Sequence, residues 1–266
     1  MRGFRWSMVM MLGLCLSAPA LLHADSTSAT QFVQKGVEAL ELGDPEAMHQ
    51  ARNYYEQALQ ADRTHYEAAW RLSEVSYYLW EAAEGWEEGE GSKRQALLEH
   101  SRIGVQAGRL AQRIEPDGVE GIFWLAANLG IWGLSNGVLD SLAQVPEILR
   151  LSERCMEVDP EGRFERGSCY RIAGALHTRL PGFPISVGDR EKALEFLQQS
   201  LVHGGDYGIN RNLLAELHLA RRQVEQAIRE LEDNLAMMES RKPHDYFDRR
   251  DTARAKSLLE KAQSRL

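Results

Sequence analysis

Hydrophobic residues recur along this chain with the period of an α-helix. From Tyr66 to Glu84 they fall on two opposite faces, at steps of three and four residues. No segment alternates hydrophobic and polar residues as a half-buried β-strand does. The pattern therefore predicts an all-α protein.

Four helical segments end in the same way, which indicates an internal repeat. Each has a small residue five places before a helix stop, in the pairs Ala58 and Arg63, Ala111 and Pro116, Cys155 and Pro160, and Ser200 and Gly205. This arrangement is typical of a tetratricopeptide (TPR) hairpin, whose second helix packs on the first through small side chains. The stops are 53, 44 and 45 residues apart, against about 34 in a standard repeat. We therefore expect a TPR-like superhelix, an α-solenoid with enlarged and irregular repeats.

The extra length is expected in three places. Residues 81–95 contain three glycines and predict a loop. Farther along, one helix is expected to span residues 121–140, and Pro146 is expected to open the next helix. The third insertion is the segment 180–189, which is rich in proline and glycine. After a more regular helix pair, residues 251–266 are expected to cap the superhelix with a polar outer face.

The N-terminus has the composition of a secretory signal peptide. Two arginines precede an apolar run from Trp6 to Leu22, and Ala24 is the small residue expected before the cleavage site. We therefore assign residues 1–24 to a signal peptide and residues 25–266 to a single TPR-like domain. The mature protein is expected in the periplasm.

The exported form is expected to carry no lipid. Leu14 is bulky where a lipoprotein peptidase needs a small residue, which disfavours lipidation of Cys15. The short apolar run and Pro19 also disfavour retention as an uncleaved anchor, but the sequence leaves that alternative open. Cleavage removes two positive charges, so the net charge falls from −8 to −10. A chain with this negative charge would be repelled by nucleic acid and by anionic lipid, so neither is an expected partner.

Cleavage would leave two cysteines, Cys155 and Cys169. They lie almost symmetrically about the turn at residues 159–162, so they would face one another on antiparallel helices. An exported protein permits a disulfide at such a pair. Two small buried thiols fit the sequence as well, and the alternatives stay open.

A stripe of aromatic residues is the first candidate for a binding surface. On one face of the helix 66–84 it comprises Tyr66, Trp70, Tyr77 and Trp80. The opposite face is also apolar, whereas stacked repeats need only part of this surface to bury one another. We predict that the stripe lines an apolar cavity for a ligand or a partner segment. Ordinary core packing is the alternative.

The next long helix adds Trp124 and Asn128 to this candidate site. A buried amide must find hydrogen-bond partners, so Asn128 either bonds a neighbouring backbone or orients a bound molecule. The same helix has a smooth ridge that would let another helix approach closely, formed by Ala126, Gly130, Gly133 and Gly137.

The sequence contains no recognisable catalytic or metal-binding motif. Its eight histidines are scattered, with no His-Glu-x-x-His pair, no Gly-x-Ser-x-Gly elbow and no phosphate-binding loop. Acidic residues at 81–90 lack the alternating ligands and the glycine of a calcium loop. We therefore expect a binding protein rather than an enzyme, with no metal and no cofactor.

The segment 180–189 is expected to be structural. Its candidate residues are Pro181, Gly182, Phe183, Pro184, Gly188 and Asp189. The prolines fix φ, the two glycines are expected to permit sharp reversals, and Asp189 is a candidate N-cap for the next helix. Phe183 and Ile185 are expected to pack over the mouth of the cavity.

Three stretches carry a resemblance to a known family. "FWLAANLGIWGLSNG", "LPGFPISVGDREKALEFLQQSL" and "RRDTARAKSLLEKAQ" resemble the T-component family of tripartite ATP-independent periplasmic (TRAP) transporters, over roughly residues 100–266. The resemblance implies a periplasmic TPR-like superhelix, association with a TRAP substrate-binding subunit, and an apolar cavity for a hydrophobic small molecule. The alternative is a general cell-envelope scaffold that binds protein partners. The sequence leaves open whether the chain forms a homo-oligomer.

Overall fold

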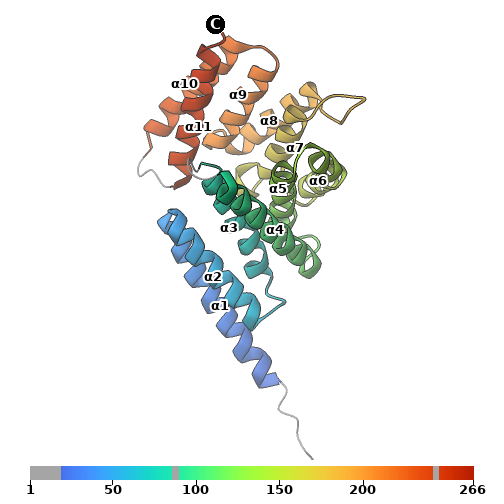
Figure 1. Cartoon of the computed structure of the whole chain (residues 1–266), viewed down its shortest axis with the longest axis vertical. Helices are drawn as coiled ribbons and strands as arrows, with labels where there is room; N and C mark the ends of the chain where they lie inside the picture. Colours follow the sequence, from blue (N-terminus) through green and yellow to red (C-terminus); the bar gives the residue numbers. More distant parts are fainter. Residues whose placement is uncertain (1–18, 86–89, 242–245) are drawn as a thin grey trace, which may run out of the picture.

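The computed structural model describes residues 19–85, 90–241 and 246–266 and is helical almost throughout (Figure 1). The helices are α1 (Pro19–Leu42), α2 (Pro45–Ala61), α3 (Tyr66–Glu84), α4 (Glu90–Ile114), α5 (Val119–Asn136), α6 (Val138–Val158), the 3-10 turn η1 (Phe164–Arg166), α7 (Ser168–Arg179), α8 (Arg190–Gly204), α9 (Gly208–Ala220), α10 (Val224–Glu239) and α11 (Tyr246–Gln263). The only β-type pairing among these residues is an isolated bridge between Gly182 and Gly188. The all-α prediction is confirmed.

Successive helices form hairpins that stack into a superhelix (Figure 1). The hairpins are α1–α2, α3–α4, α5–α6, α7–α8 and α9–α10, and α11 packs against α9 and α10 at the C-terminal end. The four predicted stops lie within two residues of the ends of α2, α4, α6 and α8. The small residues before them are fully buried, namely Ala58, Ala111, Cys155 and Ser200. The repeat pattern in the sequence therefore marks the second helix of the first four hairpins.

Carboxylate side chains set two of the helix starts. Asp44 accepts a hydrogen bond from Ala47 N at 2.9 Å, ahead of α2. Asp189 accepts from Glu191 N at 3.0 Å and from Lys192 N at 3.2 Å, and α8 begins at the next residue. The bond from Lys192 is the main cause that lowers the pKa of Asp189. The predicted N-cap at Asp189 is confirmed.

Two predicted insertions have different boundaries in the structure. Gly137, with φ of 113°, ends the expected long helix at Asn136, so α6 starts early and Pro146 lies inside it. Because Pro146 is exposed, the carbonyl that it leaves without a helical donor can bind water. The expected loop at residues 81–95 is also shorter, because α3 continues to Glu84 and α4 begins at Glu90.

Close helix contacts occur at glycines of α4 rather than along the whole predicted ridge of α5. A Cβ atom on Gly104 would lie 1.9 Å from Asn128 Oδ1, and one on Gly108 would lie 2.9 Å from the Cα of Leu125. On the predicted ridge, Gly133 is similarly close to Ser141 of α6. The ridge is thus interrupted, since Gly137 ends the helix and a Cβ on Gly130 would meet nothing within 4 Å.

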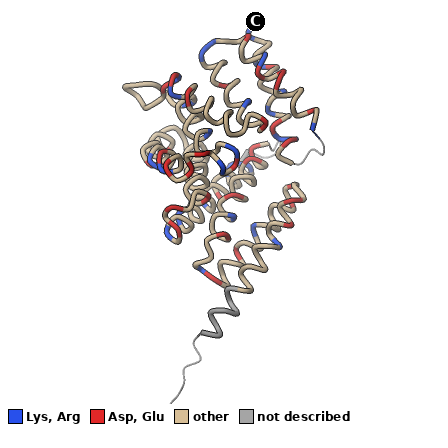
Figure 2. Tube along the Cα trace, turned by 180° about the vertical axis from the view of Figure 1, so that it is seen from behind, with Lys and Arg blue, Asp and Glu red and all other residues tan. Residues whose placement is uncertain are grey.

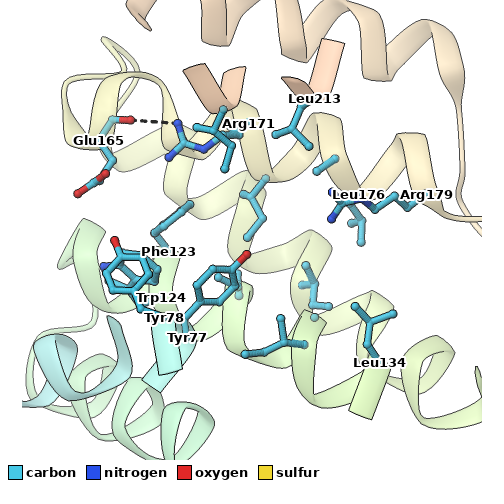
Figure 3. A pocket seen from close by; sticks show the side chains of 18 of the residues that line it. Tyr77, Tyr78, Phe123, Trp124, Leu134, Glu165, Arg171, Leu176, Arg179 and Leu213 are labelled. Carbon is cyan, nitrogen blue, oxygen red and sulfur yellow. Dashed lines mark hydrogen bonds between the residues drawn. The ribbon is translucent and has the colours of Figure 1, made fainter. Parts of the chain in front are cut away.

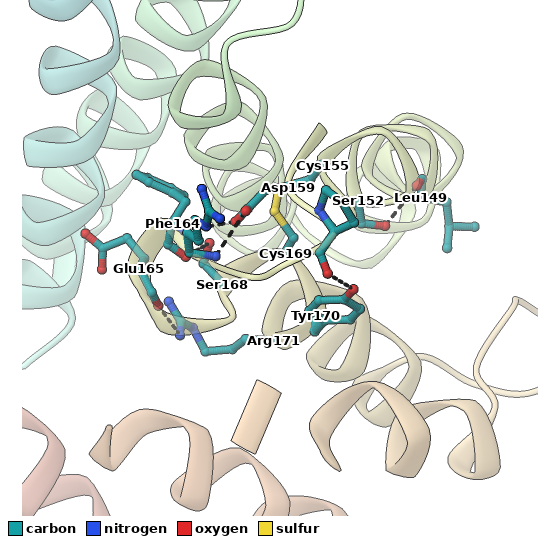
Figure 4. Close-up of a disulfide and its surroundings, with 12 residues drawn as sticks. Leu149, Ser152, Cys155, Asp159, Phe164, Glu165, Ser168, Cys169, Tyr170 and Arg171 are labelled. Atoms are coloured by element: carbon teal, nitrogen blue, oxygen red, sulfur yellow. Dashed lines mark hydrogen bonds between the residues drawn. A yellow bond between two sulfur atoms is a disulfide. The ribbon is translucent and has the colours of Figure 1, made fainter. Parts of the chain in front are cut away.

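Cys155 of α6 and Cys169 of α7 form a disulfide (Figure 4). Their Cα atoms are 5.3 Å apart. The bridge spans the turn between the helices, where Asp159 also accepts hydrogen bonds from the backbone N–H groups of Arg163 and Phe164. Of the two alternatives for these cysteines, the structure therefore shows the bridge.

The predicted export signal lies mostly outside the described residues. Arginines 2 and 5 and Cys15 fall in residues 1–18, while residues 19–24 form the start of α1. Cleavage after Ala24 stays a prediction. Among the helices that are described, none is long and apolar enough to cross a bilayer. Basic and acidic residues are interspersed along the described helices rather than separated into opposing faces (Figure 2).

Candidate functional site

Side chains from several successive hairpins surround an apolar cavity of about 220 Å³ (Figure 3). Its walls come from the first helices of successive hairpins, α3, α5, α7 and α9, with contributions from α6, η1 and α11. The apolar lining includes Phe123, Trp124, Ile131, Val145, Ile172, Leu176 and Leu213. This is the arrangement expected of a concave binding surface in a repeat protein.

Aromatic rings from α3 and α5 form one wall of this cavity. The Trp124 ring centroid lies 5.7 Å from that of Tyr77, 5.4 Å from that of Tyr78 and 4.9 Å from that of Phe123. Such tilted and edge-to-face pairs are favourable beyond their burial alone. Burial raises the pKa of Tyr77 to about 12, so its hydroxyl stays neutral at ordinary pH.

Two ion-pair clusters lie at the edge of the cavity, and both involve α11. Arg250 is 3.0 Å from Glu81 of α3 and 2.8 Å from Asp251. Burial alone would lower the pKa of Arg250, but these carboxylates outweigh it and raise the pKa. Because Arg250 and Glu81 are 169 residues apart, the pair ties the C-terminal helix to the second hairpin.

The second cluster centres on Glu216 of α9. Its Oε2 accepts from Arg179 Nη2 at 3.0 Å, and its Oε1 accepts from Arg254 Nε at 3.1 Å. Burial alone would raise the pKa of Glu216, but the two guanidinium groups outweigh it and lower the pKa. Glu216 is therefore held as a carboxylate between two arginines that line the cavity.

A larger hollow of about 550 Å³ adjoins the first cavity. The two share the lining residues Tyr77, Ile131, Leu134, Arg179 and Arg254. Trp80 also lines the second hollow, and its Nε1 donates to Ser135 Oγ at 2.8 Å. The apolar cavity therefore opens toward a more polar vestibule bounded by α3, α9 and α11.

Three of the six predicted binding residues lie at these cavities, namely Tyr77, Trp80 and Trp124. The structure brings these three side chains to the cavities, and their role in binding stays a prediction. The other three, Tyr66, Trp70 and Asn128, line neither cavity.

The remaining three residues have neighbours within the fold. The Tyr66 hydroxyl donates to Glu120 at 2.9 Å and accepts from Gly121 N at 3.1 Å. Trp70 packs against the core, with the Arg71 guanidinium 4.1 Å from its ring centroid.

Asn128 forms hydrogen bonds with the neighbouring backbone, which was the first of the two predicted alternatives for this residue. Its Nδ2 donates to the carbonyls of Ser73 and Trp124, each at 2.9 Å. The amide is fully buried and joins α3 to α5. It therefore fixes the packing of two helices that form the cavity wall.

The tip of the loop at residues 180–189 does not cover the cavity. Phe183 is 93% exposed and Ile185 is 70% exposed, so the prediction that they pack over the mouth is wrong. Figure 1 shows this loop projecting beyond α7 and α8. Its internal bonds, from Ile185 N to Gly182 O and from Gly188 N to Pro181 O, close the loop on itself.

In this loop a close backbone approach, rather than an unusual φ, explains one of the two glycines, Gly188. Gly182 and Gly188 do not have positive φ, contrary to what sharp reversals would require. A Cβ on Gly188 would lie 2.0 Å from the carbonyl oxygen of Leu180, whereas one on Gly182 would only reach 3.4 Å from Gly188 O. The base of the loop is also fixed by His177, whose Nδ1 is 2.9 Å from the Val187 carbonyl.

Sequence reasoning missed the polar lining of the cavity, which comprises Glu165, Arg171, Arg179, Tyr207, Arg250 and Arg254. The four arginines lie on amphipathic helices, where charged residues are usually expected to face solvent rather than a cavity. The clearest available signal was Arg171, which interrupts the small and apolar stretch "SCYRIAGAL". In the described ranges, no group of three His, Cys, Asp or Glu side chains could hold a metal ion.

Comparison with known proteins shows the fold. No protein-family model matches the chain, and no curated protein sequence matches it. The crystal structure of TTC0263, a thermophilic TPR protein of Thermus thermophilus, has a TM-score of 0.64 and 18% identity, covering 87% of this chain and 99% of that one. Yeast Tom70 matches with a TM-score of 0.36 and 11% identity, over 90% of this chain and 65% of that one. The first similarity shows that the chain has a TPR-like fold, and the second is too weak to add to it.

Proposed function

We propose that this chain is a non-enzymatic binding protein of the periplasm, the accessory T-component of a TRAP-type uptake system. In this role it holds a hydrophobic ligand in the apolar cavity and associates with the substrate-binding subunit of the transporter. The observation that carries the proposal is the cavity of about 220 Å³ surrounded by side chains from successive hairpins of a TPR-like superhelix. Repeat proteins use the concave side of the superhelix for binding.

An exposed apolar patch beside the cavity supports a protein partner. Leu134, Val138 and Leu139 surround the turn between α5 and α6 and are 64%, 76% and 84% exposed. Leu134 also lines both cavities. Exposed apolar side chains gathered at the edge of a pocket are typical of a docking surface. A partner bound here would contact the opening through which a ligand enters.

The second candidate is a general scaffold of the cell envelope that binds proteins unrelated to transport. The exposed loop tip at Phe183 and Ile185 favours it, because this apolar surface is separate from the lining of the cavity. A scaffold of this kind would need no small molecule. The two candidates therefore differ in one respect. The transport role needs open space in the cavity for a small molecule, whereas the scaffold role does not.

Filling the cavity separates these candidates. A Cβ on Gly130 meets nothing within 4 Å, and Gly130 borders the cavity, so Gly130→Leu adds a side chain there without a backbone clash. Protein isolated from the periplasm is analysed by native mass spectrometry and lipid extraction. We expect bound hydrophobic material on the wild type and its loss from Gly130→Leu. Gly91→Leu is the control, because Gly91 is equally unobstructed but does not line the cavity.

Partner binding is measured on the same preparations. We expect the TRAP substrate-binding subunit to co-purify with the wild type and to be lost from Leu134→Asp. Val202→Asp, which changes an exposed apolar residue on α8 away from this patch, should retain the partner. Co-purification of an unrelated envelope protein, with no small molecule in the cavity, would favour the scaffold instead.

A further inference from the structure

Arg171 is a charged side chain in the wall of an apolar cavity. It is 93% buried, since its exposed fraction is 7%. Its Nη1 donates to the main-chain oxygen of Glu165 at 3.1 Å and to Asn210 Oδ1 at 2.9 Å. The guanidinium carbon lies 5.3 Å from the ring centroid of Tyr207. These neighbours hold the guanidinium in place but are neutral groups.

The other cavity arginines differ from Arg171 in their charge partners. Arg179 and Arg254 pair with Glu216, and Arg250 pairs with Glu81 and Asp251. Within the described ranges, no carboxylate forms an ion pair with Arg171. Glu165 is adjacent but offers its main-chain oxygen, and its carboxylate points away from the guanidinium (Figures 3 and 4). A buried cation without a counter-charge is costly.

The remaining donors of Arg171 have the geometry that an oxyanion requires. Nη1 makes both side-chain hydrogen bonds of this residue in the described part of the chain, so Nε and Nη2 make none. A guanidinium edge with two parallel N–H groups binds a carboxylate through two hydrogen bonds. One carboxylate would neutralise one guanidinium, whereas a dianionic phosphate would leave a buried negative charge.

We propose that the cavity ligand is an apolar molecule with a single carboxylate, which ion-pairs with Arg171. The apolar part of the ligand lies against Trp124 and Leu176, and the carboxylate occupies the end of the cavity nearest α9. This inference rests on the proposed function, because it requires that the cavity takes a small molecule. It adds the chemical class of that molecule and the residue that selects it.

Probes of equal chain length test the head-group requirement. Decanoate, decanol and decyl phosphate are titrated into the mature protein, after delipidation, by calorimetry. A charged hydrogen-bonded pair contributes about 1.5 to 3 kcal/mol, so we expect decanoate to bind at least about tenfold more tightly than decanol. If no probe binds, the proposed function and this inference both fail. If decanol binds as tightly as decanoate, or decyl phosphate binds more tightly, the cavity function stands and this inference is overturned.

Variants then identify the residue responsible. Arg171→Gln should bind decanol as the wild type does but lose the preference for decanoate, whereas Arg171→Lys, which keeps the charge, should retain part of it. Arg179→Gln is the matched control, because Arg179 lines the same cavity but pairs with Glu216. A preference that survives in Arg171→Gln, or is lost equally in Arg179→Gln, overturns the assignment. A merely structural role of Arg171 would weaken the binding of decanol and decanoate alike.

Discussion

The two halves of α3 carry the same aromatic pattern but meet different surroundings. In the N-terminal half, Tyr66 hydrogen-bonds residues of α5 and Trp70 packs against the Arg71 guanidinium, so neither side chain faces a cavity. In the C-terminal half, Tyr77 and Trp80 line the two cavities. A shared helical face therefore does not imply a shared role.

Glycines close the first half of this helix against its neighbours. A Cβ on Gly118 would lie 2.0 Å from the Tyr66 hydroxyl, and Gly104 and Gly108 let α4 approach α5 beside Asn128. Among the described glycines, none approaches the C-terminal half of α3 from another helix, and the side chains of Arg179, Arg250 and Arg254 line the cavities there. The cavity thus begins at the point along α3 beyond which glycines no longer allow the neighbouring helices to pack closely.

Replacing Trp124 should give the largest change, because Trp124 lies at the boundary between the closed and open halves. It is 3% exposed and contacts three other aromatic rings. We expect Trp124→Ala to lower the free energy of unfolding by about 3 to 5 kcal/mol, measured by denaturant titration. Trp70→Ala, at a partly exposed site, should cost less. If Trp124→Ala and Trp70→Ala lowered the free energy of unfolding equally, the two halves would be packed alike.

Removing the disulfide should be the next largest effect, since the bridge joins α6 and α7, two helices that both contribute residues to the cavity wall. The cysteines are 14 residues apart, and closing a loop of that length contributes about 3 kcal/mol. We expect the double change Cys155→Ala and Cys169→Ala to lower unfolding stability by about that amount. Reductant should destabilise the wild type similarly and leave the variant unaffected. A wild type insensitive to reductant under denaturing conditions would contradict this prediction.

Adding one methyl group should lower the stability of the fold beside the N-terminal half of α3 and raise it at the cavity beside the C-terminal half. Gly104→Ala would push against Asn128, which is held by its own hydrogen bonds, and should lower stability by about 1 to 3 kcal/mol. Gly130→Ala adds a Cβ in open space within α5 and should raise stability by up to about 1 kcal/mol. Melting temperatures of the two variants test this contrast. A stable Gly104→Ala variant would mean that α4 can move away at little cost.

The pH dependence of stability should appear only over a limited pH range, and it concerns Glu74 at the middle of α3. Burial raises the pKa of Glu74 to about 7, although Arg71 opposes this. The folded state therefore binds the proton more tightly than the unfolded state, and this contribution is lost as pH rises from about 4.5 through 7. Glu74→Gln cannot ionise, so its stability relative to the wild type should increase over that range. Glu67→Gln, which also loses a pair with Arg71, controls for the broken ion pair. A constant difference between Glu74→Gln and the wild type would contradict the raised pKa.

Local chemistry was sufficient to predict the repeat framework. Helical period, the small residues Ala58 and Ala111, and the side chain of Asp189 act within one hairpin, so their positions along the chain are enough to place them. Pro146 was misplaced because an exposed helix position tolerates a lost backbone bond, which the residue type does not reveal.

The cavity lining depends on contacts between distant segments. Arg250 meets Glu81 only because α11 returns to α3, and Arg171 becomes a buried cation only because η1 and α9 enclose it. The sequence places both arginines on amphipathic helices and says nothing of which neighbours enclose them. Hydrophobic period thus sets where helices form and which sides are apolar. Whether an apolar side becomes core or cavity depends on how closely other helices approach it, and that distance is a property of the packed superhelix.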